Sequence, residues 1–334
     1  MLKWLTVLSI TILVACDKEI IEHPLDTLLE VPAGFPVPVF PEDNQLTEER
    51  WTLGRRLFYD PILSRDGSLS CASCHLAAHA FSDVKRVSEG IEQRLGGRNA
   101  PTLANVAYHP YYTREGGVPT LEMQILVPIQ EHAEFDFNIL LIVDRMLNDS
   151  TYVEQSLKAY NRTPDPFVIT RAIATFERSL ISGASRYDKF INGDLSALSM
   201  EERQGMTLFF SDRLSCTTCH SGFNFTNYSF ENNGLYVEYA DPGRFRLTGD
   251  TIDEALFKVP TLRNIEVTAP YMHDGSISSL EEVVEHYNSG GNNHMHKSQL
   301  VKPLQLTTAE KEELVAFLKS LTDYDFLTNP KFRN

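Results

Sequence analysis

Two copies of one five-residue motif carry the residue types that could bind a redox cofactor. The first is Cys71-Ala-Ser-Cys74-His75 and the second is Cys216-Thr-Thr-Cys219-His220. In an exported protein, C-x-x-C-H attaches haem c: the thiols bond to the haem vinyl groups and the histidine supplies an axial nitrogen to iron. One copy is also compatible with a redox C-x-x-C beside an unrelated histidine, but two copies favour haem. The sequence therefore predicts two covalently bound haem c groups, with His75 and His220 as iron ligands.

The start of the chain indicates export. Lys3 precedes an apolar run from Trp4 to Val14, which is too short for a membrane-spanning helix of about 20 residues. The following Leu-Val-Ala-Cys resembles the lipobox of bacterial lipoproteins. We therefore expect a lipoprotein signal peptide over residues 1–16 and lipidation of Cys16; the alternative is an ordinary signal peptide cut nearby. Either alternative places the mature protein outside the cytoplasm, and a lipid would anchor it in the periplasm or cell envelope.

Composition excludes several classes of protein. The 334 residues include 45 acidic and 30 basic side chains, for a net charge of −15, and 42% are apolar. This balance is that of a folded acidic protein and excludes disorder, a disulfide scaffold and nucleic-acid binding. The length suggests about two domains. Five prolines between residues 17 and 45 predict an extended tether between the membrane and the folded body.

The flanks of the two motifs also repeat. Helices are predicted after Thr47 and after Ser199, because each hydroxyl N-cap precedes acidic residues and a Gly-x-x-Leu-Phe sequence. Downstream, Phe176-Glu177-Arg178-Ser179-Leu180 matches Phe317-Leu318-Lys319-Ser320-Leu321. These matches predict a mainly α protein of two cytochrome c-like haem domains in tandem, with long ordered loops. The expected domain boundaries are 46–195 and 196–334.

These features resemble the bacterial dihaem cytochrome c peroxidase family, including its MauG-like (methylamine-utilisation) branch. The resemblance runs from Leu46 to Thr322. Its further signatures are Arg98-Asn99-Ala100-Pro101-Thr102-Leu103, the stretch 121–134, Phe257-Lys258-Val259-Pro260-Thr261-Leu262-Arg263-Asn264 and Ala269-Pro270-Tyr271-Met272-His273-Asp274-Gly275. It implies that the N-terminal haem is the peroxidatic site and that the C-terminal haem passes electrons to it.

The resemblance also bears on the sixth coordination position of the first haem iron. Family members that need reductive activation have a distal histidine seven residues before Arg-Asn-Ala-Pro, where this chain has Ile91. His79 is the nearest alternative, but it follows His75 by only four residues and is expected on the proximal side. We therefore expect a first haem that binds peroxide without prior reduction.

Two side chains match the residues that line the peroxide pocket of the family. They are Gln124 and Glu134, and a carboxylate in this position can move the peroxide proton as an acid-base group. Glu131 and Asp136 are competing carboxylates that the sequence alone does not separate from Glu134.

Tyr287 matches the family position of the sixth ligand to the second haem. The main peroxidase branch has Met at this position and the methylamine-utilisation branch has Tyr. A phenolate would favour ferric and higher oxidation states more than a thioether does. Met295 and Met272 are the competing ligands.

The family also binds calcium between its haem units. The matching residues are Asn99, Thr268 and Pro270, of which only Asn99 offers a side-chain oxygen. The same region holds one departure from the family: Arg114 stands where a tryptophan usually lies between the haems. An inter-haem route would then use Tyr111, Tyr112 or through-space coupling.

Three functions are compatible with these residues. The first is a cytochrome c peroxidase that reduces H2O2 with electrons from a small cytochrome c or cupredoxin, whose basic surface would complement the acidic chain. The second is a MauG-like oxidase acting on a protein or organic substrate. The third is a dihaem electron-transfer cytochrome. The family resemblance also makes a homodimer possible.

Overall fold

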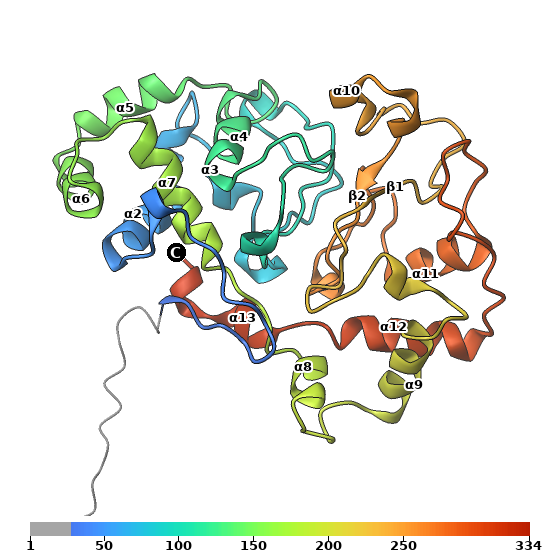
Figure 1. Cartoon of the computed structure of the whole chain (residues 1–334). Coiled ribbons are helices and arrows are strands. Elements are labelled where there is room, and N and C mark those ends of the chain that lie inside the picture. The colour runs from blue at the N-terminus through green and yellow to red at the C-terminus, as the bar shows by residue number, and fades with distance from the viewer. Residues whose placement is uncertain (1–27) are drawn as a thin grey trace, which may run out of the picture.

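The computed structural model describes residues 28–334 and is mainly helical (Figure 1). The helices form two groups on opposite sides of the molecule, and α8 lies at its lower edge, toward the second group. The helix bounds are α2 Glu48–Tyr59, α3 Leu121–Gln124, α4 Leu126–Gln130, α5 Ile139–Leu147, α6 Ser150–Tyr160, α7 Pro166–Arg178, α8 Arg186–Ile191, α9 Met200–Phe209, α10 Phe245–Thr248, α11 Leu280–Ser289, α12 Thr308–Lys319 and α13 Tyr324–Thr328. The two short strands, β1 Phe230–Glu231 and β2 Phe257–Lys258, pair antiparallel. Single turns of 3-10 helix connect many of these elements.

Helix starts follow the capping chemistry that the sequence indicates. Thr47 caps α2 by accepting a hydrogen bond from the backbone N–H of Arg50. Ser199 and Glu202 form a capping box at the start of α9, and Thr307 and Glu310 form another at the start of α12. The helix starts predicted after Thr47 and after Ser199 are confirmed, since each cap satisfies backbone donors that the first turn leaves unpaired.

Two hydrophobic cores are built on the same helix-pair geometry. The first core surrounds α2 and α7, and the second surrounds α9 and α12. Phe58 packs on Phe176 in the first core with ring centroids 5.1 Å apart, and Phe209 packs on Phe317 in the second at the same separation. The repeated sequence blocks thus form equivalent aromatic contacts, which fix each helix pair behind its C-x-x-C-H turn.

A glycine allows close approach in each helix pair. A Cβ atom on Gly54 would lie 1.9 Å from the carbonyl oxygen of Ala172, and one on Gly205 would lie 1.8 Å from that of Glu313. Neither distance is sterically possible, so these positions admit no side chain unless the helices separate.

The end of the chain returns to the first core. After α12, which belongs to the second core, the chain runs below the first helix group as α13 (Figure 1). Phe326, Leu327 and Phe332 are buried in the first core. The last residues of the chain therefore pin the two helix groups together.

The described part of the proline-rich segment differs from the expected tether. Phe35 packs between Tyr108 and Phe223, with ring centroids 6.2 and 4.6 Å away, and the guanidinium of Arg263 lies over its ring. Tyr108 also donates a hydrogen bond to the carbonyl of Pro36. Residues 28–45 therefore dock on the folded body, because an aromatic side chain gains more by burial there than in an extended linker. Residues 1–27, including the expected signal peptide and Cys16, lie outside the described residues.

Between residues 28 and 334, no helix combines the length and apolar character needed to cross a bilayer.

We predict that Gly205→Ala lowers the free energy of unfolding by about 1–3 kcal/mol, because the added methyl group must push α9 away from α12. Urea unfolding followed by circular dichroism would measure this loss. Gly97→Ala is the matched control, since Gly97 has no atom within 4 Å of its Cβ position. Equal stability of the two variants would contradict the close-packing argument.

Candidate functional site

Both C-x-x-C-H motifs orient their histidine in the same way. Each motif begins with a 3-10 turn, Cys71–Ser73 or Cys216–Thr218. His75 Nδ1 lies 2.7 Å from the carbonyl oxygen of Phe81, and His220 Nδ1 lies 3.0 Å from that of Phe225. Because a carbonyl only accepts, Nδ1 must carry the proton and Nε2 keeps its lone pair for a metal.

An unusual backbone conformation supplies these two carbonyls. Phe81 and Phe225 both have positive φ angles, 59° and 50°. Their rings nevertheless pack in the cores, against Phe58 and Phe209 respectively. The left-handed residue turns its carbonyl toward the histidine while the ring stays buried, so core packing sets the orientation of the imidazole.

The motif cysteines fit covalent attachment better than metal ligation. None of the four described cysteines forms a disulfide. Burial raises the pKa of Cys74, Cys216 and Cys219 to about 11, so these thiols stay protonated at neutral pH. Within residues 28–334, no group of three or more His, Cys, Asp or Glu side chains could hold a metal ion. Neutral thiols beside an Nε2 lone pair fit haem c, which would supply the iron at each motif.

Glu134 lies in the environment of the first motif. Burial is the main cause of the raised pKa of Cys71 and Cys74, and Glu134 adds a small contribution to both, which places its carboxylate within electrostatic reach of the two sulfurs. Burial, with a smaller contribution from the charge of Glu131, raises the pKa of Glu134 itself to about 7. A carboxyl group with this pKa exchanges its proton in the neutral range, as an acid-base catalyst requires.

Gln124 ends α3 and has a buried polar atom without a partner. Its Oε1 is enclosed and accepts no hydrogen bond. An orphaned acceptor of this kind is costly in a folded protein unless a ligand or water completes it. The atom therefore marks a polar position that a bound molecule could fill.

Close backbone packing fixes the position of Glu134. The N–H of Ile91 donates to the carbonyl of Glu134 over 3.0 Å, and a Cβ on Gly90 would lie 2.8 Å from the Cα of Glu134. Ile91 itself is 1% exposed and contributes no ligand atom. An apolar residue therefore occupies the position where a distal histidine would lie.

The three competing carboxylates differ in exposure, in charged partners and in pKa. Glu131 is exposed. Asp136 is held in ion pairs with Arg94 and Arg65, 2.8 and 2.6 Å away, and the hydrogen bond from Arg94 lowers its pKa. Of the three, Glu134 is the one whose pKa is raised, and it is partly buried.

Tyr287, on α11, faces the second motif. Burial raises the pKa of Tyr287, and a hydrogen bond with Asn233 partly opposes this shift. The charges of Cys219 and Cys216 raise the pKa slightly further, so the phenol lies near both thiols. Met295 is 81% exposed, which removes it from contact with a buried metal. Met272 lies nearer, and its sulfur accepts a hydrogen bond from Asn233 Nδ2 at 3.2 Å. Geometry therefore favours Tyr287 over Met295.

His79 connects the two helix groups. Its Nδ1 lies 3.0 Å from the carbonyl oxygen of Val267, which belongs to the segment before Thr268. This contact gives His79 a structural role in the packing between the two groups.

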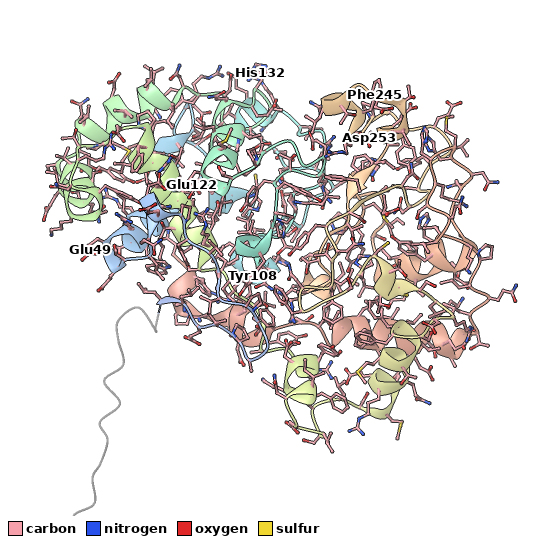
Figure 2. The ribbon with its side chains drawn as sticks, in the orientation of Figure 1. Glu49, Tyr108, Glu122, His132, Phe245 and Asp253 are labelled. Carbon is pink, nitrogen blue, oxygen red and sulfur yellow. The ribbon has the colours of Figure 1, made fainter. Side chains whose placement is uncertain are left out.

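An aromatic cluster crosses between the groups. The ring of His109 stacks near Tyr112, with centroids 6.3 Å apart, and packs edge-on against Tyr228 at 5.2 Å. His109 Nε2 is buried without a partner, and burial lowers the pKa of this histidine well below its usual value. Tyr111 donates a hydrogen bond to the carbonyl of Tyr228. Figure 2 shows neighbouring Tyr108 at the junction of the two groups and Glu122 inside the first.

Glu177 is a buried acid that sequence analysis did not assign. It is 5% exposed, and burial raises its pKa to about 8. It also raises the pKa of Cys71, so it lies near the first motif. A comparison of the two repeated sequence blocks could have identified Glu177. The second block has the apolar Leu318 at the equivalent position, which indicates a buried site, whereas Arg178 is matched by another basic residue, Lys319.

The residues expected to bind calcium do not fit that ion. Arg114 donates from Nη2 to Asn99 Oδ1 over 3.1 Å and to the Asn99 carbonyl over 2.8 Å. A guanidinium thus already occupies the one side-chain oxygen of the expected set. Pro270 is joined to Ala269 by a cis peptide bond, and Thr268 precedes that pair.

Comparison with known proteins gives consistent matches. The family model described as di-haem cytochrome c peroxidase matches residues 48–196. The methylamine utilization protein MauG of Methylorubrum extorquens is 35% identical, with 84% of this chain and 80% of the relative covered. Cytochrome c551 peroxidase of Nitrosomonas europaea is 34% identical, with 85% and 82% covered.

A solved structure is also similar. It is the crystal structure of a MauG-like protein associated with microbial copper homeostasis, with a TM-score of 0.86 and 36% identity. The match covers 91% of this chain and 97% of that one.

Proposed function

Because this chain belongs to the di-haem cytochrome c peroxidase family, we propose that it reduces H2O2 to water at the first motif with electrons that enter through the second. The chain is an oxidoreductase of this peroxidase family, and its cofactors are two haem c groups. Three features support the proposal: Glu134 has a pKa raised to about 7, Gln124 has a buried acceptor without a partner, and Ile91 stands where a ligating histidine would be expected.

Haem at the first motif would supply an iron that binds peroxide and the electrons that break its O–O bond. The protein residues move the protons. Glu134 as carboxylate takes the proton from the peroxide oxygen nearest the iron and returns it to the leaving oxygen. Gln124 Oε1 accepts a hydrogen bond from the bound peroxide and orients it. The balanced reaction consumes one H2O2, two electrons and two protons and forms two waters.

We assign the iron ligands and the haem domains on the same basis. Cys71, Cys74 and His75 hold the first haem, and Cys216, Cys219 and His220 hold the second, with Tyr287 as its sixth ligand. The two hydrophobic cores support an N-terminal peroxidatic haem domain over 46–195 and a C-terminal electron-transfer domain over 196–334, whose last residues pack on the first core.

Electrons would pass between the domains through the aromatic cluster. Tyr112 lies on the side of the first domain and Tyr228 on the side of the second, with His109 packed against both. This route replaces the tryptophan that the family usually has at the position of Arg114.

The protein would work in the periplasm or cell envelope, anchored through lipid on Cys16. Its electron donor would be a small cytochrome c or cupredoxin with a basic surface, since the chain carries a net charge of −15. A homodimer is compatible with the family.

One observation favours a second candidate function. Tyr287, the residue type of the MauG-like branch, faces the second motif, and MauG is among the relatives at 35% identity. A phenolate ligand would let the second haem share oxidising equivalents, which suits oxidation of a protein or organic substrate at the surface.

Peroxide and reduced cytochrome c together distinguish these functions. We expect the oxidised dihaem protein to oxidise the donor rapidly, at two cytochromes per H2O2, because the first haem is open. A long-lived oxidised state with slow donor turnover would favour the MauG-like oxidase. No reaction with peroxide would leave only an electron-transfer cytochrome.

Glu134→Gln should slow the reaction with H2O2 by about 10²- to 10⁴-fold while haem content stays unchanged, because the acid-base group is lost. In the wild-type protein this rate should rise with pH through about 7, since only the carboxylate accepts the proton. Stopped-flow absorbance at several pH values would measure both effects. Glu131→Gln is the matched control: it should keep the fast rate and lower the pH midpoint, because the Glu131 charge helps to raise the pKa of Glu134.

Tyr287→Phe should alter the resonance Raman spectrum of the second haem through loss of the phenolate bands, and leave that of the first haem unchanged. Met295→Leu serves as its control and should change neither spectrum. An unaltered second-haem spectrum in Tyr287→Phe would exclude phenolate ligation.

A further inference from the structure

We propose that the guanidinium of Arg114 takes the place of calcium between the two haem domains, so that this protein binds no calcium at Asn99. In this role the guanidinium joins the two domains and takes no part in the reaction at the first haem. This role follows from the contacts of Arg114, from the charges around it and from the segments that it joins.

Both oxygen atoms of Asn99 are used by Arg114. Nε and Nη2 donate to the backbone carbonyl over 3.0 and 2.8 Å, and Nη2 also donates to Oδ1 over 3.1 Å. The other end of the same amide is fixed as well, because Asn99 Nδ2 donates to the carbonyl of Lys85 over 3.2 Å. Asn99 is 5% exposed, and its buried side-chain amide is held at both ends by these hydrogen bonds.

A calcium ion beside this guanidinium would be repelled. Calcium binds oxygen at 2.3–2.6 Å, so an ion on Asn99 Oδ1 would lie within roughly 6 Å of Arg114 Nη2. Burial, reinforced by the neighbouring charge of Arg98, lowers the pKa of Arg114 to about 10, and the side chain stays charged at neutral pH. Lys258 adds a further positive charge nearby: burial, with a smaller contribution from the charge of Arg114, lowers its pKa to about 8.

The nearby acids are already paired. Asp241 accepts two hydrogen bonds from Arg98, at 2.6 and 2.9 Å, and Glu115 accepts a third. Asp274 accepts from Tyr236 and pairs with Arg86. These carboxylates neutralise arginines of the protein and are therefore not free to compensate a divalent ion.

Arg114 also makes the connection that a bridging ion would make. Its own carbonyl accepts a hydrogen bond from the backbone N–H of Lys258 on β2, over 2.7 Å. The N–H of Asn99 donates to the carbonyl of His273 over 2.9 Å. The Arg114–Asn99 pair thus holds two loops of the first domain against two segments of the second.

Metal analysis of the purified dihaem protein tests the inference. After dialysis against buffer with micromolar calcium, we expect far less than one calcium per two haem irons by mass spectrometry, and no change in melting temperature on addition of EGTA. About one calcium per chain, removed by EGTA together with a fall in melting temperature, would overturn the proposal.

A second experiment tests whether the protein binds calcium once the guanidinium is removed. Within the described residues nothing donates a hydrogen bond to the carbonyls of Thr268 and Pro270, so removal of the guanidinium frees Asn99 Oδ1 to complete three oxygen ligands. We expect Arg114→Trp to bind about one calcium per chain and to melt at a higher temperature with calcium than with EGTA. Arg86→Gln, which removes a more exposed arginine from Asp274, is the control and should bind none. A calcium-free Arg114→Trp protein with both haems in place would show that Arg114 is not what excludes the ion.

Discussion

The hydrogen bond from Nδ1 of each motif histidine to a phenylalanine carbonyl is the contact on which the rest of the structure depends. It fixes which ring nitrogen faces the iron and the direction in which the imidazole points. The carbonyl is available only because Phe81 and Phe225 adopt positive φ angles, and their rings are held in that conformation by the cores. Helix packing, aromatic contacts and iron ligation are therefore one connected system in each half of the chain.

On this common frame, the two halves differ in the residues that we assign to the far side of each haem iron. The first has Ile91, Glu134 and Gln124, which provide no ligand, one titrating carboxyl group and one unfilled acceptor. The second has Tyr287, which offers a phenol oxygen. On the proposed assignment, a difference of a few side chains would convert one repeated unit into a peroxide site and an electron-transfer site. Glu177 extends the contrast, because the first half buries an acid where the second has Leu318.

Much of this arrangement was predictable from the sequence, because it depends on local patterns. The C-x-x-C-H spacing, the hydroxyl caps and the repeated Phe positions each act within one or two turns of chain, and the structure places them in matching positions. The docking of Phe35 was missed because proline spacing favours an extended chain, while the partners Tyr108 and Phe223 come from distant segments.

Long-range contacts account for the other differences. Glu134, Glu131 and Asp136 are equivalent by composition and differ only in which neighbours the fold brings to them. Arg114 was visible as a departure from the family, but its hydrogen bonds to Asn99 require knowledge of how residues 99 and 114 meet. The sequence likewise gave no indication that His109 would pack against both Tyr112 and Tyr228.

The proposed reaction requires that the first haem be open in the resting protein and the second closed. Electron paramagnetic resonance of the fully oxidised protein, before and after one equivalent of H2O2 and without any reductant, tests it most directly. We expect one high-spin and one low-spin ferric signal per chain, with the high-spin signal lost on addition of peroxide. Two low-spin signals that persist after peroxide is added would contradict it.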